Sequence, residues 1–585
     1  MKKNYILVTL LLLIFLFFSC NHKKENSENN SSNKTKRTLE EKAEDTQERY
    51  LYEYNLQKNP KTDKIPQNEK NLEFENSLLA KEQSFLAKVN SNSYLSRGPS
   101  NLGGRTRSVK IDISDPSGNT IISGGVSSGV FRTTNGGNSW SKVSSNSDIH
   151  NATVIAQDPR EGNQNIWYYG TGEFSGNSAA LGSNYLGNGI WKSTDSGLTW
   201  QQLPGTNSGV FGSFDNPFDI IIDMQVHPIT GDLFVSTVDK LYRFTENGPV
   251  VELEMENNNT GWTDIVITST GRVFASIETI NGLDRGIVWT SSTGSGSWNP
   301  IASSSSPSGW RSNGRVTLAV APSNEDVLYV LYRNNQSNNS SNRVSEADLW
   351  QYQMSSGTWT NYTGKLPDEP GSDSDGNDPF SIQGGYDLVI SVKPDNQNFI
   401  VIGGTNIYKI EDITVDAMFK RIGGYAGPGG YALYSEGGVE HHSDIHAIEW
   451  DINDTNTLYS GTDGGVHKTT NLNTNFVRWV NLNNNYLTYQ YYHINMINDE
   501  GDDYVIGGAQ DNGTTIGGFS ASRNDKSSMT SYFGGDGAAV AVAKSTQGLG
   551  LDYVTYISTQ RGRMLRGNNT QVTTVITPIE SNDAN

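Results

Sequence analysis

Short apolar runs alternate with turn-forming residues along most of the chain. Residues 109–113 alternate apolar and polar side chains, an Asp-Pro turn follows at 115–116, and a second apolar run covers 120–124. Alternation over this length is typical of a half-buried β-strand, and Asp, Pro and Gly mark the turns between strands. The same order of run, turn, run and hairpin recurs, and nine units can be traced as far as residue 557.

The clearest hairpin lies at residues 189–200. It contains the motif Ser193-Thr-Asp195-Ser-Gly197-Leu-Thr199-Trp200. Asp195 is expected to hydrogen-bond the backbone two residues further on, and Gly197 to supply a positive φ angle. Trp200 then places a large apolar surface at a fixed distance from the turn. The motif therefore predicts a strand, a tight turn and a second strand that carries its own anchor.

Variants of this motif recur along the chain. A close copy contains Asn135, Gly137 and Trp140, and weaker copies end at Trp298, Trp359 and Trp479. The spacing of these tryptophans predicts two further units without one, near residues 250 and 420, where 240–244 and 406–410 have strand-like patterns. A repeat of about 40 to 60 residues built from short strands is typical of a propeller or another repeat array.

The motif Ser-x-Asp-x-Gly-x-Thr-Trp resembles the Asp-box, or bacterial neuraminidase repeat. This repeat occurs on blade hairpins of sialidases, sortilin-type propellers, xyloglucanases and photosystem-assembly propellers. The resemblance covers roughly residues 95 to 580 and implies an all-β, multi-bladed β-propeller of four-stranded repeats. It does not imply one reaction, because unrelated activities share this fold.

Two ring closures are open for residues 93–585. Nine units exceed the four to eight blades of a typical propeller. The resemblance allows a single ring of about ten blades, as in sortilin, or two seven-bladed rings, as in xyloglucanases, with the second ring incomplete. Since an open ring would leave a bare sheet edge, we expect the repeats to continue beyond residue 585.

The amino-acid composition says more about which partners the protein could bind than about its fold. Hydrophobic residues make up 34% of the 585 residues, while 61 glycines and 10% aromatic residues suit many thin blades. The formal net charge is −19. Such an acidic surface argues against a nucleic-acid partner, because phosphates would not be neutralised.

The amino terminus has the features of an export signal. Residues 1–20 combine two lysines, an apolar run and Cys20, the only cysteine of the chain. They resemble the lipobox of bacterial lipoproteins, which implies a membrane-anchored protein held by lipid on Cys20 at the outer membrane or cell surface. Residues 21–38 are predicted to form a disordered tether, and residues 39–92 a helical segment.

Three aspartates follow strand-like runs in glycine-rich settings: Asp463, Asp511 and Asp536. If their strands end near the propeller axis, two of them could serve as the acid and base of a glycoside hydrolase. The alternative, which we favour, is that each is a turn aspartate bonded to its own backbone.

Two clusters have weak metal-binding patterns. His442, Asp444 and His446 would share one face of a strand and could bind zinc, although a polar strand facing a channel is the interpretation we favour. Residues 373–378 carry oxygen donors at alternate positions but lack the glycine and glutamate of a calcium loop. No cofactor is therefore predicted, with calcium as the one that remains possible.

We therefore predict an exported, lipid-anchored propeller that serves as a binding platform for a protein, peptide or glycan; the polar insert 173–187 suits such a role. A scaffold role in an envelope complex fits equally well. The enzymatic alternative is a xyloglucanase-like hydrolase. A sialidase is disfavoured, because its Phe-Arg-Ile-Pro-type start has only the distant match 64–66.

Overall fold

In the computed structural model, residues 96–576 are described with gaps, together with parts of 51–80. The gaps are 146–150, 175–184, 208–215, 239, 246, 255–262, 279–286, 304–305, 340, 375, 499–502, 519–526, 545–552, 560–562 and 569–571. The predicted signal with Cys20 and the predicted tether 21–38 lie outside the described residues. The chain divides into two compact units, Met1–Pro66 and Gln67–Asn585.

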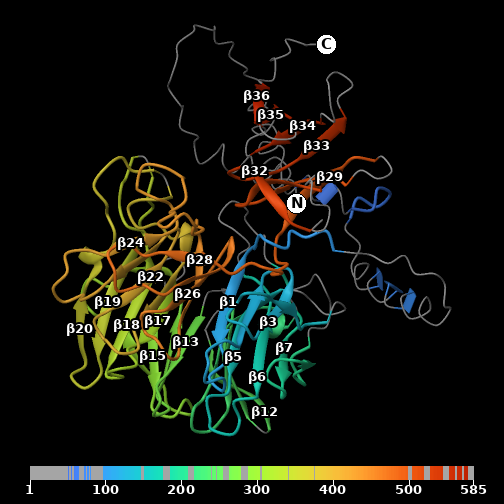
Figure 1. Cartoon of the computed structure of the whole chain (residues 1–585). Coiled ribbons are helices and arrows are strands. Elements are labelled where there is room, and N and C mark those ends of the chain that lie inside the picture. Colours follow the sequence, from blue (N-terminus) through green and yellow to red (C-terminus); the bar gives the residue numbers. More distant parts are fainter. Residues whose placement is uncertain are drawn as a thin grey trace, which may run out of the picture. The chain divides into compact units, whose positions relative to one another are not determined.

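The described strands of the second unit form nine four-stranded antiparallel sheets, each in sequence order (Figure 1). The first three sheets are β1 (Thr106–Ile111), β2 (Ile121–Gly125), β3 (Gly129–Thr133) and β4 (Ser141–Lys142); β5 (Ala152–Gln157), β6 (Trp167–Thr171), β7 (Ile190–Ser193) and β8 (Gln201–Gln202); and β9 (Ile221–Val226), β10 (Leu233–Thr237), β11 (Lys240–Thr245) and β12 (Gly248–Glu254).

The next four sheets follow the same plan. They are β13 (Thr263–Ile267), β14 (Val273–Ile277), β15 (Ile287–Ser291) and β16 (Asn299–Ala302); β17 (Ser312–Val320), β18 (Val327–Asn334), β19 (Ala347–Gln353) and β20 (Thr358–Asn361); β21 (Val389–Val392), β22 (Ile400–Gly403), β23 (Ile407–Ile410) and β24 (Lys420–Gly423); and β25 (Ile445–Trp450), β26 (Leu458–Thr462), β27 (Gly465–Thr469) and β28 (Trp479–Asn481).

Two more sheets complete the described part of the chain. They are β29 (Tyr491–Met496), β30 (Val505–Ala509), β31 (Gly513–Gly517) and β32 (Met529–Phe533); and β33 (Val540–Lys544), β34 (Tyr553–Ser558), β35 (Met564–Gly567) and β36 (Val572–Ile576). Among the described residues of the second unit, three short 3-10 helices lie in loops, at Pro217–Asp219, Thr363–Lys365 and Gln383–Gly385.

The first seven sheets close into a ring. The first strand of each sheet packs against the first strand of the next, from β1 through β5, β9, β13, β17, β21 and β25, and β25 packs back against β1. The last two sheets pack against each other through β29 and β33. The described residues thus form one seven-bladed ring followed by two further blades, which corresponds to the second of the two predicted closures rather than to a single ring of about ten blades.

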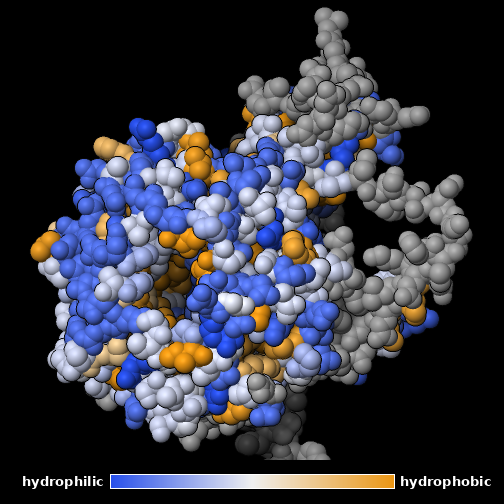
Figure 2. All heavy atoms as spheres, turned by 60° about the horizontal axis from the view of Figure 1, so that its bottom comes forward, coloured by the Kyte–Doolittle hydropathy of each residue, from blue (hydrophilic) through white to orange (hydrophobic). Residues whose placement is uncertain are grey.

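The core lies between neighbouring sheets rather than at one centre. At the closing seam, Trp140 of the first sheet packs against Tyr486, which follows β28, with ring centroids 5.1 Å apart. The Trp140 indole Nε1 donates to the carbonyl oxygen of Leu482 at 2.6 Å. Polar side chains cover much of the ring face shown in Figure 2, and apolar ones lie among them singly or in small groups.

The predicted hairpins join the third and fourth strands of their sheets. In the turn after β7, Asp195 accepts from the amide of Thr199 at 2.9 Å and from that of Leu198 at 3.2 Å. The carboxylate therefore caps the backbone three and four residues on, and the predicted bond two residues on is wrong. Gly197 has the predicted positive φ, at 76°.

The two units predicted without a tryptophan are present as full sheets, with β11 and β23 at the expected runs. Helical residues occur where the helical segment was predicted, among them Leu51, Tyr54, Leu72 and Leu79. Within the described part of the chain, no helix has the length and apolar character that crossing a bilayer would need.

Candidate functional site

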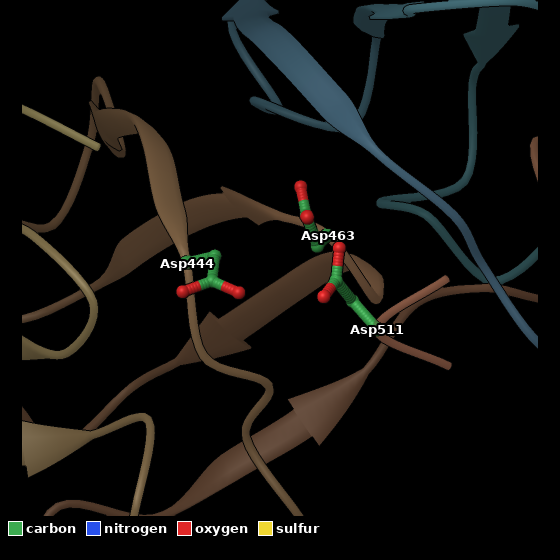
Figure 3. Close-up of side chains that lie close together, drawn as sticks. All are labelled: Asp444, Asp463 and Asp511. Atoms are coloured by element: carbon green, nitrogen blue, oxygen red, sulfur yellow. The ribbon is translucent and has the colours of Figure 1, made fainter. Parts of the chain in front are cut away.

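The aspartates singled out from the sequence lie at the ends of strands from two different sheets. Asp463 follows β26 in the seventh blade, and Asp511 follows β30 in the eighth. Together with Asp444, which precedes β25, they form a group in which one carboxylate oxygen of each residue lies within 4.8 Å of those of the other two (Figure 3). Asp536, after β32, accepts a hydrogen bond from the backbone amide of Asp511 at 2.8 Å.

Asp463 is held by two charged or polar partners from other strands. The Arg105 guanidinium donates from Nε to Oδ1 at 2.6 Å and from Nη2 to Oδ2 at 2.5 Å. His446 lies 2.6 Å from the same Oδ1 through its Nε2. Burial by itself would raise the pKa of the Asp463 carboxyl, but Arg105 and His446 hold this pKa well below its usual range. Asp463 is therefore an ionised carboxylate whose two oxygens both accept hydrogen bonds from fixed partners.

Asp511 and Asp444 show the opposite behaviour. Burial, with the charges of Asp463 and Asp444, raises the pKa of Asp511 well above its usual range, although Arg105 also donates to it at 2.9 Å. Burial and the Asp463 charge raise the pKa of Asp444 to about 7. Both residues adopt positive φ angles, 61° for Asp444 and 58° for Asp511. Such angles are uncommon outside glycine and often accompany functional sites.

A cleft of about 720 Å³ opens beside this group. Its walls come from loops around the seventh blade and from the eighth blade, so the cleft lies between the ring and the pair of further sheets. Carboxylates and tyrosines dominate the lining, together with glycine backbone: Glu440, Asp444, Asp511, Asp536, Tyr425, Tyr431, Tyr489, Gly464, Gly513, Gly534 and Gly535. Concave sites of this size with convergent polar groups are typical of ligand binding.

The two histidines of the predicted zinc cluster already use their ring nitrogens for other contacts. His442 has both ring nitrogens 3.0 Å from carbonyl oxygens, those of Ser443 and Asp511. The Nδ1 atom of His446 lies 2.8 Å from Arg107, and its Nε2 contacts Asp463. A zinc ion would have to displace these contacts before the imidazoles could bind it.

The three-carboxylate group also fits a divalent cation poorly. The Arg105 guanidinium already donates to Asp463 and Asp511. A metal ion would place a second positive charge against it, while the oxygens of Asp463 are engaged. In the segment 373–378, Asn377 is buried and donates to the carbonyl oxygens of Gly427 and Gly430, both at 2.7 Å. Asp375 of that segment lies outside the described residues.

Sequence reasoning missed the basic residues of the site. Arg105 and Arg107 follow a glycine pair just before and within β1, and only that Gly-Gly-Arg-Thr-Arg run could have indicated them. Arg107 pairs with Glu173 at 3.3 Å. Both arginines lie over the ring of Tyr386, at 5.4 and 4.9 Å from its centroid. The axis of the ring thus holds a buried, mutually paired charge network.

This network contains a tyrosine, a glutamate and several arginines, the residue types that a sialidase would require. However, Glu173 and Tyr386 are 1% and 4% exposed. Arg315 donates to the carbonyl oxygens of Gly385 and Tyr386. None of these side chains lines the cleft, and their bonds to one another suit a structural role in the ring.

No family model and no curated protein sequence matches the chain. The fold is similar to that of three solved enzymes. They are a GH74 enzyme of Niastella koreensis (15% identity, TM-score 0.53, 81% of this chain and 66% of that one), an ancestral GH74 enzyme (15%, 0.56, 82% and 63%) and the GH74 xyloglucanase of Xanthomonas campestris (12%, 0.50, 82% and 74%). The chain therefore spans less than two thirds of the length of the first two, and at these identities the likeness establishes the β-propeller fold alone.

Proposed function

We propose that this chain is an exported, lipid-anchored β-propeller whose cleft binds a segment of a protein, peptide or glycan at the cell surface. The observation that carries the proposal is the cleft of about 720 Å³, with three tyrosines and four carboxylates in its wall. Tyrosine offers a flat apolar face and a polar tip, a combination that serves binding surfaces well. The pattern of residues 1–20, with Cys20 after the apolar run, supports export and lipid attachment.

Binding is favoured over hydrolysis by the state of the aspartates. Asp463 is held by three hydrogen bonds from Arg105 and His446, which fix its orientation and keep it ionised. One oxygen of Asp444 and one of Asp511 lie within 4.8 Å of each other, and Arg105 donates to both Asp463 and Asp511. This crowding suits a fixed cluster of paired charges better than an acid and a base that stand on either side of a glycosidic bond.

The test is a binding screen of the purified full chain against surface peptides and soluble glycans, followed by microscale thermophoresis on each hit. Tyr431→Ala removes a tyrosine that is 61% exposed, so it should not disturb folding. We expect this change to weaken binding of a cleft ligand about fivefold or more. If a ligand bound the Tyr431→Ala and Tyr489→Ala variants with the affinity of the unchanged chain, the cleft would not be its binding site.

A glycoside hydrolase of xyloglucanase-like type is the second candidate. Asp511 favours it, because the pKa of this carboxyl is raised by burial while its side chain remains 25% exposed beside the cleft. A protonated carboxyl of this kind could act as a general acid, with Asp536 nearby as base. Reducing-sugar release from xyloglucan and other β-glucans, abolished by both Asp511→Asn and Asp536→Asn, would establish this candidate. The absence of release from these substrates would leave binding as the function.

A further inference from the structure

Four carboxyl groups line the cleft. Glu440 and Asp444 belong to the ring side, while Asp511 and Asp536 belong to the eighth blade. Among the described residues that line the cleft there is no lysine or arginine. The nearby Arg105 guanidinium is already shared between Asp463 and Asp511. The cleft lining therefore contains more acidic groups than basic ones, and a bound cation would favour the ionised forms of Asp444 and Asp511, whose pKa values are raised without it.

Crowding of these carboxylates decides which ligand would be favoured. Burial and neighbouring carboxylates raise the pKa values of Asp444 and Asp511, so each ionises at the cost of repulsion from the others. A neutral sugar hydroxyl would leave that repulsion in place. An ammonium or guanidinium group would remove it and would gain charge-assisted hydrogen bonds.

The aromatic wall suits the same kind of group. Tyr425 and Tyr431 meet edge to face with ring centroids 5.3 Å apart, and Tyr489 lines another part of the cleft. The face of a tyrosine ring attracts a cation within about 6 Å. Leu102 and Leu433 add apolar surface, against which the aliphatic part of an arginine or lysine side chain can pack.

Two further features of the lining suit a peptide that carries a cationic side chain. His467 is 2% exposed and its Nδ1 has no hydrogen-bond partner among the described residues. Burial lowers the pKa of His467 to about 3, so the ring is neutral and does not oppose a cation. Gly534 and Gly535 are exposed in the wall, and a Cβ on Gly534 would meet nothing within 4 Å, so the main chain of an extended peptide can approach closely there.

We propose that the cleft binds an extended peptide through an arginine or lysine side chain, whose charged group lies among Asp444, Asp511 and Asp536. This inference rests on the proposed function and specifies its ligand class. The tyrosine faces hold the base of that side chain, and Glu440 at the exposed rim attracts it from solution.

The experiment measures fluorescence anisotropy of labelled peptides with the purified full chain. One peptide carries a single central arginine between small neutral residues, and its matched control carries citrulline, which has the same shape without the charge. A chitosan oligomer and a neutral β-glucan oligomer form the other two arms. Glu440→Gln is compared with Glu161→Gln, which removes the same charge from an exposed turn between β5 and β6.

We expect the arginine peptide to bind about tenfold tighter than the citrulline peptide. Glu440→Gln should weaken it about threefold to tenfold, and Glu161→Gln should leave it unchanged. Equal binding of both peptides would overturn the inference but keep the proposed function. Binding of a glycan arm alone would overturn the peptide as ligand. If the folded chain bound none of the four probes, both the inference and the proposed function would fail.

Discussion

Arg105 and Asp463 form a two-point ion pair between the start of the first blade and the seventh blade, with Nε–Oδ1 and Nη2–Oδ2 distances of 2.6 and 2.5 Å. Both side chains are nearly buried, at 7% and 3% exposed. The Nη2 atom also reaches Asp511 at 2.9 Å. One guanidinium thus links the seam of the ring to the eighth blade, and it helps to keep Asp463 ionised.

Arg105→Lys should destabilise the fold, because a lysine ammonium cannot reproduce the forked geometry and would leave a buried carboxylate incompletely paired. Loss of a partner from a buried pair costs about 3 to 5 kcal/mol, and we expect the conservative lysine to show the lower part of that range. The check is the thermal unfolding midpoint, with the exposed Arg478→Lys as control. Equal midpoints for the two variants would contradict the structural role of Arg105.

Asp444 predicts a pH dependence of stability. Its folded-state pKa of about 7 lies above the unfolded value of about 4. Between these pH values the folded chain keeps a proton that the unfolded chain has released, so the free energy of unfolding falls as the pH rises from about 4 to 7. The loss is at most about 4 kcal/mol for this residue. Asp463 acts in the opposite direction, since its depressed pKa gives stability that is lost as the pH falls.

Chemical unfolding across this pH range separates the contribution of Asp444. Asp444→Asn keeps a hydrogen-bond acceptor for Gln383, which donates to Asp444 at 2.6 Å, and should flatten the decline toward pH 7. Asp454→Asn, on the exposed turn between β25 and β26, is the matched control and should keep the wild-type slope. A wild-type slope in Asp444→Asn would show that this carboxyl is not the titrating group.

The sequence predicted the blades better than it predicted the site. Runs such as 240–244 and 406–410 identified β11 and β23 because alternation is a local property of a strand. The ring closure was left open between two alternatives, because packing of β1 on β25 joins residues 339 positions apart, as Arg107 and His446 show. Nothing local in either strand specifies which blade it will meet.

The same limit applies to the candidate aspartates. Glycine-rich settings indicated Asp463, Asp511 and Asp536, but could not distinguish a locked carboxylate from one with a raised pKa. That difference depends on Arg105, which stands more than 350 positions away from Asp463. The left-handed backbone of Asp444 and Asp511 was equally hidden, because aspartate tolerates a positive φ better than most residues but nothing in the sequence marks where it adopts one.

Gly197 and Gly205 lie close together along the chain in the second blade. Their replacement by alanine distinguishes the backbone cost of losing a glycine from the cost of a packing clash. Both have positive φ, 76° and 83°, but a Cβ on Gly197 would lie 2.2 Å from the Cδ1 atom of buried Ile122, whereas a Cβ on Gly205 would meet nothing within 4 Å. Either change to alanine should cost about 1 kcal/mol for the backbone. Gly197→Ala should cost about 1 to 3 kcal/mol more. Denaturant titration of both variants measures the loss in the free energy of unfolding. Equal losses would mean that the Ile122 side chain moves aside without a measurable energetic cost.

The outward face of β29 predicts self-association. Ile494 and Met496 on that face are 53% and 57% exposed, whereas Asn495 on the other face accepts from the amide of Val542 in β33 at 3.1 Å. Within the ring, the corresponding face of each sheet is covered by the neighbouring sheet. Exposed contiguous apolar surface commonly mediates association, so Ile494→Lys should raise the dissociation constant of the self-associated form by about tenfold or more.

Sedimentation velocity over a range of concentrations measures this effect. Ile229→Lys is the matched control, because Ile229 is 61% exposed but stands on the turn after β9, away from that face. Self-association that persists in Ile494→Lys would place the contact elsewhere on the chain. Self-association that Ile229→Lys also abolishes would show that added charge, rather than the β29 face, controls it. Loss in Ile494→Lys alone would identify this face as an interaction surface separate from the cleft.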